Sequence, residues 1–294
     1  MSNQERKLIC GPYVGEFGWE LFFWSGYCRA LSRHFDQTIV ITRPGRNMLY
    51  EDFANVENYS PPPHGVADCE NNSAFTDEEF KILVEKYGTD ASWFRPFPQD
   101  RGPFGVHWAQ PVWVQQVNGF LSPEYISRDR KNDLKEKIII IHARNRADVR
   151  PVDNPPIEML NALVQVLKSK YRVVTIGQRG NSMWVEGTED WRNQSLSAIT
   201  ALMDQAVCVV GTTSGPMHLA SLMGCPVITW QWDYEKMWYR FSSAWNPHDS
   251  NLILIKTKGE RDLYHNHPSH LQLTWAIEKI QEDGFNKMQV ESDT

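Results

Sequence analysis

A short polar segment between two apolar ones has the clearest chemical potential in this sequence. Residues 211–218 read Gly-Thr-Thr-Ser-Gly-Pro-Met-His. The apolar run 208–210 is too short for a helix and stops at a glycine, which predicts a buried strand. Pro216 suits the first turn of a helix, because its missing N–H would have no intrahelical partner there. Gly224 then predicts a left-handed helix end, and Pro226 prevents continuation.

A helix that starts in this segment could hold an anion, since its first N–H groups are unpaired and lie at the positive end of the helix dipole. Thr213, Ser214 or Gly215 can cap the helix. Thr212, Thr213 and Ser214 add hydroxyl donors, and Gly215 lets a phosphate approach the backbone. His218 lies four residues after Ser214 and faces the same way. The alternative is an ordinary strand-to-helix turn in which His218 is simply hydrogen-bonded.

The first half of the chain has the pattern of an α/β domain. A strand over 7–11, a helix over 21–34 and a strand over 37–42 predict one βαβ unit of a parallel sheet. Weaker patterns predict a short helix over 46–53, a short strand over 56–59, a helix over 76–87, and irregular structure over 91–120 with one strand near 112–117.

The second half repeats the α/β alternation around the segment described first. The charged segment 122–137 predicts a linker, which divides the chain into domains 1–130 and 131–294. Ser269 and Gln272 have capping-box spacing at the start of the last helix. The predicted elements are a strand over 137–142, a helix over 156–169, a strand over 172–176, a helix over 195–206, a strand over 251–255 that closes the sheet, and a helix over 269–283.

Composition restricts the class of protein. The chain has 294 residues and a net charge of −6, which excludes a protein coated in basic surface. A local basic lip for nucleic acid remains open, formed by Arg29, Arg33, Arg43 and Arg46. No apolar run approaches the ~18 residues of a membrane span, and no signal region follows the start, so we expect a cytoplasmic protein. The five cysteines lack a paired spacing and predict free thiols.

A family resemblance sharpens these expectations. Residues 211–227 resemble the donor-site signature of the heptosyltransferase-like glycosyltransferases, with a Ser/Thr-Gly pair, a His shortly after it, and Gly-x-Pro-Val. Thr213 stands where that family usually has an acidic residue. The resemblance implies the GT-B fold, in which two Rossmann-like domains face each other across a cleft and a C-terminal helix returns to the first domain. It also implies a nucleotide-diphosphate sugar as co-substrate, with no metal and no further cofactor.

The same resemblance gives a role to the turn after the first strand. Gly15-Glu16 resembles the family's Gly-Asp turn, whose acidic residue deprotonates the acceptor hydroxyl. An inverting transfer needs a carboxylate at the acceptor oxygen, and the carboxyl end of a strand is where open α/β sheets bind ligands. Gly15, Trp19 and Glu20 are weaker candidates for contacts there. Alternatively, Glu16 or Glu20 simply caps the helix.

Arginines follow the strand over 137–142. Arg144 and Arg146 match the position of the family's first donor-domain loop, where a basic residue meets the diphosphate. They alternate, so one of the two is expected to face the cleft. A guanidinium would bind phosphate in a bidentate manner and stabilise the departing nucleotide. The alternative is a pair of surface arginines beside Asp148 and Asp153.

Other candidates are weaker. Gln178 and Arg179 end the next strand and could contact the nucleotide. Trp232 belongs to an aromatic loop that could stack on a base or sugar, although core filling is the more frequent use of such residues. A histidine group before the last helix lacks the spacing of a metal site; its members are His265, His267 and His270.

The sequence thus predicts an inverting, metal-independent glycosyltransferase that uses a nucleotide-sugar donor. The resemblance implies a lipopolysaccharide-type glycan as the acceptor, and a hydroxylated base in DNA stays open as another. Two alternatives stay open, a nucleotide-sugar epimerase of the same fold and a non-catalytic nucleotide- or glycan-binding protein.

Overall fold

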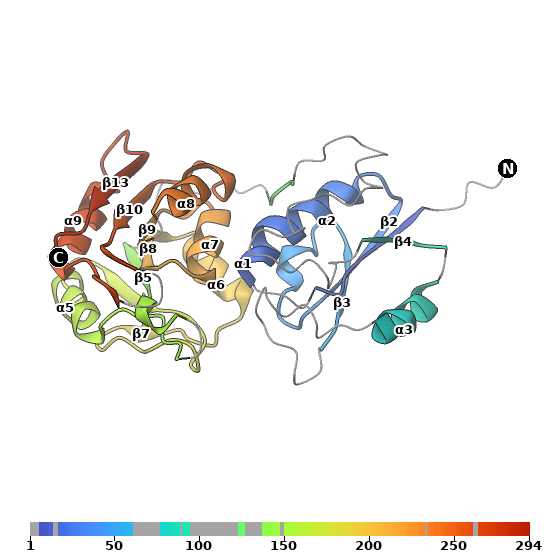
Figure 1. Cartoon of the computed structure of the whole chain (residues 1–294), viewed down its shortest axis with the longest axis horizontal. Helices are drawn as coiled ribbons and strands as arrows, with labels where there is room; N and C mark the ends of the chain where they lie inside the picture. Colours follow the sequence, from blue (N-terminus) through green and yellow to red (C-terminus); the bar gives the residue numbers. More distant parts are fainter. Residues whose placement is uncertain are drawn as a thin grey trace. The chain divides into compact units, whose positions relative to one another are not determined.

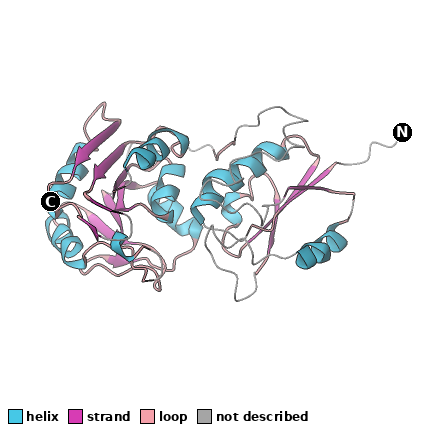
Figure 2. Ribbon diagram, in the orientation of Figure 1, coloured by secondary structure: helices cyan, strands magenta, loops and turns pink. Residues whose placement is uncertain are grey.

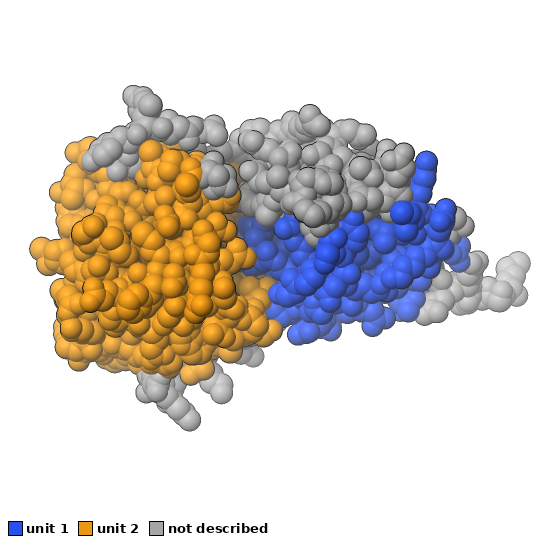
Figure 3. Space-filling view, turned by 90° about the horizontal axis from the view of Figure 1, so that it is seen from below, with its two compact units in different colours: residues 1–126 blue, residues 127–294 orange. Residues whose placement is uncertain are grey.

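The chain forms two units, residues 1–126 and 127–294, and each is built around a parallel sheet flanked by helices (Figures 1 and 2). Figure 3 shows the two units in different colours. The computed structural model describes residues 6–13, 17–60, 77–88, 90–94, 123–126, 137–147, 150–232, 234–260 and 264–294. The predicted α/β class is confirmed. Within these residues no helix is both long and apolar enough to span a bilayer.

The first unit contains a four-stranded sheet in the order β3-β2-β1-β4, and every described pair is parallel. Its strands are β1 (Lys7–Cys10), β2 (Gln37–Thr42), β3 (Asn55–Asn58) and β4 (Ser92–Phe94). β4 lies in the segment predicted as irregular, so that prediction is wrong there. The strand predicted near 112–117 lies outside the described residues. Helix α3 (Asp77–Tyr87) follows the predicted range closely.

The helical connection from β1 to β2 is not a uniform α-helix. It consists of α1 (Phe17–Trp19), a π-helical turn η1 (Glu20–Trp24) and α2 (Ser25–Ser32). The helical segment predicted over 21–34 therefore begins earlier, at Phe17. Its π-helical turn η1 is wider than a turn of an α-helix. Such π turns are rare and frequently occur at functional sites. A short 3₁₀ helix, η2 (Asn47–Leu49), occupies part of the helix predicted over 46–53.

The second unit contains a seven-stranded parallel sheet in the order β13-β10-β9-β8-β5-β6-β7. The sequence predicted 251–255 as the closing strand, which is wrong because β13 pairs with β10 and forms the edge. The strands are β5 (Ile138–His142), β6 (Arg172–Thr175), β7 (Glu189–Asp190), β8 (Ala206–Thr212), β9 (Val227–Gln231), β10 (Leu252–Lys256) and β13 (Lys287–Glu291), with β11 (Gly259–Glu260) and β12 (Tyr264–His265) as a separate antiparallel pair.

Helices cover both faces of this sheet (Figure 1). The helical elements are η5 (Pro151–Asp153), α5 (Ile157–Leu167), α6 (Leu196–Met203), α7 (Gly215–Leu222), α8 (Tyr234–Tyr239), the π turn η6 (Arg240–Ala244) and α9 (His270–Lys279). α8 and η6 replace the loop expected after β9. α9 packs against α5 and contributes Leu273 and Ile277 to the core of the second unit. The expected return of this last helix to the first domain stays a prediction.

The connections of the larger sheet reverse direction between β5 and β8. Strand β5 leads through α5 to β6 on one side, whereas β8 pairs with its other side and continues to β9. Open α/β sheets bind ligands at the carboxyl ends of strands at such a switch point. Ile139 and Ile141 pack in the core with α5 and α9, so strand alternation places Ile140 and His142 on the opposite face. His142 pairs in register with Gly211.

Close contact between β5 and β8 depends on Gly211. A Cβ atom there would lie 2.7 Å from the His142 carbonyl oxygen and 3.2 Å from Met217 Sδ. We expect Gly211→Ala to lower the free energy of unfolding by about 1–3 kcal/mol, because the strand backbones cannot both keep their places. Gly180→Ala is the control, since no atom lies within 4 Å of its Cβ position. Equal stability of the two variants in urea titrations would contradict this account.

Candidate anion site at the start of helix α7

Helix α7 begins as its sequence predicts. Ser214 is the N-cap residue and Pro216 lies in the first turn. Gly224 follows the helix with φ +70°, the left-handed conformation expected of it. The N–H groups of Met217 and His218 bond to the Ser214 carbonyl oxygen at 3.0 and 3.1 Å. The Gly215 N–H has no acceptor among the described residues, and it can therefore bond to a ligand.

Two hydroxyl groups beside this helix start are buried without partners. Thr212 and Thr213 are 2% and 3% exposed, and neither Oγ1 atom has a hydrogen-bond partner in the described part of the chain. An unpaired buried polar group costs about 1–3 kcal/mol. Buried groups of this kind call for a physical explanation, such as a missing water or ligand. Their position at the end of β8 is where the sequence predicted hydroxyl donors to an anion.

His142 joins the end of β5 to the start of α7. Its Nδ1 atom lies 3.0 Å from Ser214 Oγ. Burial, together with the nearby Arg144 guanidinium, lowers the pKa of His142 to about 4. The imidazole is therefore neutral at neutral pH. The sequence analysis did not single out this residue, although a polar side chain at the end of an all-isoleucine strand is a usable signal.

His218 faces an aromatic and cationic environment. Its ring stacks on Phe241 at 4.9 Å and meets the Trp245 ring edge-on at 4.6 Å. Burial, together with the charges of Arg240 and Arg150, lowers the pKa of His218 to about 3. Arg240 also lies over the Trp245 ring, 4.6 Å from its centroid. Two guanidinium groups from distant segments are thus close enough to act on one residue of α7.

The predicted arginines of the loop after β5 have different surroundings. Arg144 is 3% exposed, and its Nη1 donates to the Arg150 carbonyl oxygen at 2.7 Å and to Asn154 Oδ1 at 2.6 Å. The Asn154 side chain also bonds to the backbone of Arg146. It accepts from the Arg146 N–H at 3.0 Å and donates to the Arg146 carbonyl oxygen at 2.9 Å. Arg144 therefore fastens the loop, and Arg146 is anchored through its backbone.

Arg150 is the arginine of this loop that acts on α7. It adopts φ +45°, a left-handed conformation uncommon for a residue with a side chain, and its Nη1 lies 3.3 Å from Asp153 Oδ2. The sequence analysis missed both Arg150 and Arg240. The residue before a proline avoids the right-handed helical conformation, so the Arg150-Pro151 step was a signal that the loop turns here. Arg240 lies in a π turn that no sequence pattern marked.

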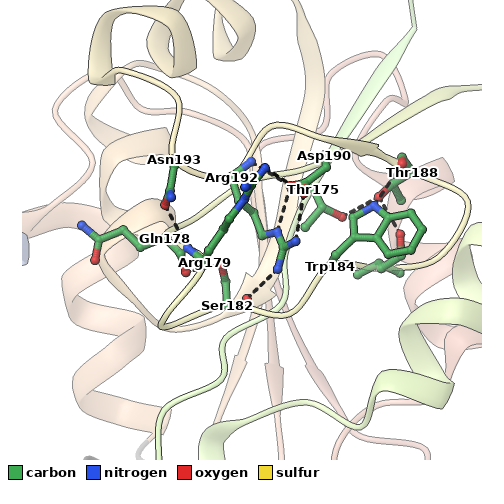
Figure 4. A network of polar contacts seen from close by, with 10 residues as sticks. Thr175, Gln178, Arg179, Ser182, Trp184, Thr188, Asp190, Arg192 and Asn193 are labelled. Carbon is green, nitrogen blue, oxygen red and sulfur yellow. Dashed lines mark hydrogen bonds and ion pairs between the residues drawn. The ribbon is translucent and has the colours of Figure 1, made fainter.

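Gln178 and Arg179 belong to a separate polar network at the ends of β6 and β7 (Figure 4). The Gln178 carbonyl oxygen accepts from Ser182 Oγ at 2.8 Å, and the Arg179 N–H donates to Asn193 Oδ1 at 2.9 Å. Arg192 bridges the Asp190 carboxylate and the Ser182 carbonyl oxygen. Hydrogen bonds from Arg192 lower the pKa of Asp190 to about 2. The network fixes the loop that carries the exposed Arg179.

Some of the remaining predicted site residues lie within the described residues and others lie outside them. Gly15 and Glu16 lie outside the described residues, as does the side chain of Trp19. Trp232 is half-buried beyond β9. Glu20 is buried, and its Oε1 accepts from Thr42 Oγ1 at 2.7 Å and from the Tyr50 hydroxyl at 2.8 Å.

Glu20 also lies 3.6 Å from Arg46 Nε. Burial and this carboxylate raise the pKa of Tyr50 well above its usual range. These contacts indicate that Glu20 stabilises the fold. We expect Glu20→Ala to lower the free energy of unfolding by about 3 kcal/mol, because it leaves the buried hydroxyls of Thr42 and Tyr50 and the partly buried guanidinium of Arg46 without this carboxylate. Glu51→Ala, at an exposed position, should change it by less than about 0.5 kcal/mol. A stable Glu20→Ala variant in chemical denaturation would refute this role.

The other predicted groups show ordinary contacts. His267 Nδ1 accepts from Trp230 Nε1 at 2.9 Å. No three His, Cys, Asp or Glu side chains of the described residues are arranged to hold a metal ion. Four cysteines are free and buried, as predicted, and Cys69 lies outside the described residues.

Comparison with known proteins identifies the fold. No family model and no curated protein sequence matches the chain, but solved structures do. A glycosyl transferase family 9 protein from Veillonella parvula DSM 2008 aligns with 94% of this chain and 97% of its own, at 11% identity and a TM-score of 0.60. The ADP-heptose lps heptosyltransferase II of E. coli aligns with 94% of this chain and 98% of its own, at 12% identity and a TM-score of 0.59.

A third structure, the E. coli heptosyltransferase WaaC with ADP, aligns with 94% of this chain and 99% of its own, at 14% identity and a TM-score of 0.57. The alignments extend over both units of this chain rather than over one sheet. The predicted GT-B fold of two Rossmann-like domains is therefore confirmed.

Proposed function

We propose that the protein is a glycosyltransferase whose donor, a nucleoside-diphosphate sugar, binds with its diphosphate at the start of helix α7. The observation that carries this proposal is the set of unpaired donors at the switch point, namely the Gly215 N–H and the buried hydroxyls of Thr212 and Thr213. The helix dipole favours negative charge at the same place. The GT-B fold shared with three glycosyltransferases supports the same assignment.

The charges around α7 suit a departing diphosphate. The charges of Arg240 and Arg150 both act on His218, and His142 and His218 are neutral. Two guanidinium groups and a helix start can therefore neutralise the diphosphate as the bond to the sugar breaks. Arg150 replaces Arg144 as the proposed phosphate-binding arginine of the first loop, since the described contacts of Arg144 Nη1 are with the loop itself. Arg179 would lie toward the nucleoside.

The transfer step needs one further group, a base for the acceptor. In the proposed mechanism Glu16 accepts the acceptor's hydroxyl proton while the oxygen attacks the anomeric carbon. The bond from that carbon to the diphosphate breaks, and the nucleoside diphosphate leaves with the electron pair. Backside attack inverts the anomeric configuration. A sugar hydroxyl of a glycan or a hydroxylated base of DNA would serve as acceptor.

Donor binding can be tested without knowing the acceptor. A thermal-shift panel of ADP, GDP, UDP and CDP should contain a ligand that stabilises the chain, by about 2.7 kcal/mol at 100 times its Kd. For that ligand, Arg150→Met should weaken binding by about 10- to 100-fold, because a charge-assisted hydrogen bond is lost.

Arg172→Met is the matched control for this variant. Arg172 is 35% exposed in an ion pair with Glu189, much as Arg150 is 34% exposed beside Asp153. Arg172, however, lies at the amino end of β6, whereas α7 begins beyond the carboxyl end of the parallel strand β8. Calorimetry should give the control the wild-type Kd. Equal weakening in both variants would show a general charge effect and contradict the assignment of Arg150.

The base assignment makes a different prediction. Glu16→Gln should lower the rate of sugar transfer by about 10²- to 10⁴-fold and leave nucleotide binding unchanged, because the carboxylate acts on the acceptor alone. Glu85→Gln, on the exposed side of α3, is the control. The assay compares glycan acceptors with hydroxymethylated DNA. Transfer by Glu16→Gln at the wild-type rate would remove Glu16 from the mechanism, and a new sugar formed from donor alone would instead indicate an epimerase.

A further inference from the structure

The side chain of His142 lies in a space that two neighbouring glycines keep open. A Cβ atom at Gly177 would lie 3.1 Å from His142 Cδ2, and one at Gly211 would lie 3.3 Å from His142 Cβ. Gly177, just after β6, and Gly211, near the end of β8, therefore lie against the His142 side chain. His142 is 5% exposed, so packing fixes the orientation of its ring.

The described hydrogen bond of this ring is with the residue that caps α7. His142 Nδ1 lies 3.0 Å from Ser214 Oγ, and the Ser214 side chain accepts from no backbone N–H of the helix. An N-cap serine ordinarily accepts such a bond. Ser214 uses its hydroxyl toward His142 instead, and it is partly exposed at the helix start.

The position of one proton decides what Ser214 can bind. A neutral imidazole carries its proton on one nitrogen and accepts on the other. With the proton on Nε2, Nδ1 would accept the Ser214 hydroxyl proton, and oxygen lone pairs would face the helix start. With the proton on Nδ1, the ring donates to Ser214 Oγ, and the hydroxyl proton is free to point at an anion.

We propose that His142 is a positioning residue that holds its proton on Nδ1, donates it to Ser214 Oγ, and so directs the Ser214 hydroxyl proton at a phosphate oxygen bound at the start of α7. This inference rests on the proposed function for the identity of the anion, a diphosphate.

The electrostatic surroundings are consistent with this arrangement. Arg144 follows in the chain and helps to keep the ring neutral, so that one tautomer has to be selected. Gly177, Gly211 and Ser214 bring no charge of their own to the ring. The unpaired hydroxyls of Thr212 and Thr213 provide further donors beside Ser214, which makes the helix start a cluster of donors.

The tautomer can be measured directly on the wild-type chain at neutral pH. In ¹⁵N-histidine-labelled protein, the His142 signals are assigned by their absence from the spectrum of His142→Asn. We expect a protonated, pyrrole-type Nδ1 and an unprotonated, pyridine-type Nε2. A pyridine-type Nδ1, or an imidazolium with both nitrogens protonated, would overturn the proposal.

A double-mutant cycle tests the effect on binding, with inorganic pyrophosphate and the best nucleoside diphosphate as probes. His142→Phe keeps the ring but not the donor, and should weaken binding by about 10-fold. In a Ser214→Ala background it should have no further effect. His142→Asn, whose amide can donate from nearly the position of Nδ1, should bind within about 3-fold of wild type.

The two proposals fail in different ways. Independent effects of His142→Phe and Ser214→Ala, in a chain that still transfers sugar, would overturn the role of His142 and keep the proposed function. Coupled effects on pyrophosphate binding, in a chain that transfers no sugar, would keep the role of His142 and refute the proposed function. If His142→Phe does not fold, the cycle runs with His142→Asn and His142→Gln, where binding retained by Asn and lost by Gln is expected and equal loss would contradict the proposal.

Discussion

The start of helix α7 lies where the connections of the described seven-stranded sheet reverse. The contact that holds it there is the close approach of β5 and β8. Gly211 allows this approach, because a side chain there would meet the His142 carbonyl oxygen at 2.7 Å. The end of β5 then lies beside Ser214, and the N–H of Gly215 is left without an acceptor among the described residues. A helix start with free donors is an anion site by virtue of its geometry and its dipole.

The ionisable groups of this region combine neutral imidazoles with guanidinium groups. Burial and neighbouring arginines keep His142 and His218 neutral, with Arg144 acting on His142 and with Arg240 and Arg150 acting on His218. Arg150 lies 3.3 Å from Asp153, so a diphosphate bound in the proposed manner would share this guanidinium with a carboxylate. In the first unit, the carboxylate of Glu20 is bonded to Thr42, Tyr50 and Arg46. That carboxylate serves the fold, which leaves the catalytic base to Glu16 in the proposed mechanism.

Local chemistry made part of this structure predictable. Pro216 and Gly224 fix the ends of α7 through their own backbone preferences, so the sequence located that helix closely. β13 was missed because its edge position leaves residues such as Gln289 and Glu291 exposed and its pattern weak. The π turn η1 was missed because the spacing of apolar residues there is the same as in an ordinary α-helix. Arg150 and Arg240 come close to α7 only through tertiary packing, which local sequence patterns do not predict. Arg144, which the sequence singled out, donates a hydrogen bond to Asn154 instead.

The central claim is that the diphosphate of the donor binds at the first turn of α7. A crystal structure of the full chain with its tightest-binding nucleoside diphosphate tests this most directly. The account predicts a phosphate oxygen within hydrogen-bond distance of both the Gly215 nitrogen and Ser214 Oγ, with the Arg150 guanidinium on the same phosphates. A nucleotide bound elsewhere, with the Gly215 N–H and the Thr212 and Thr213 hydroxyls bonded to protein atoms, would contradict it.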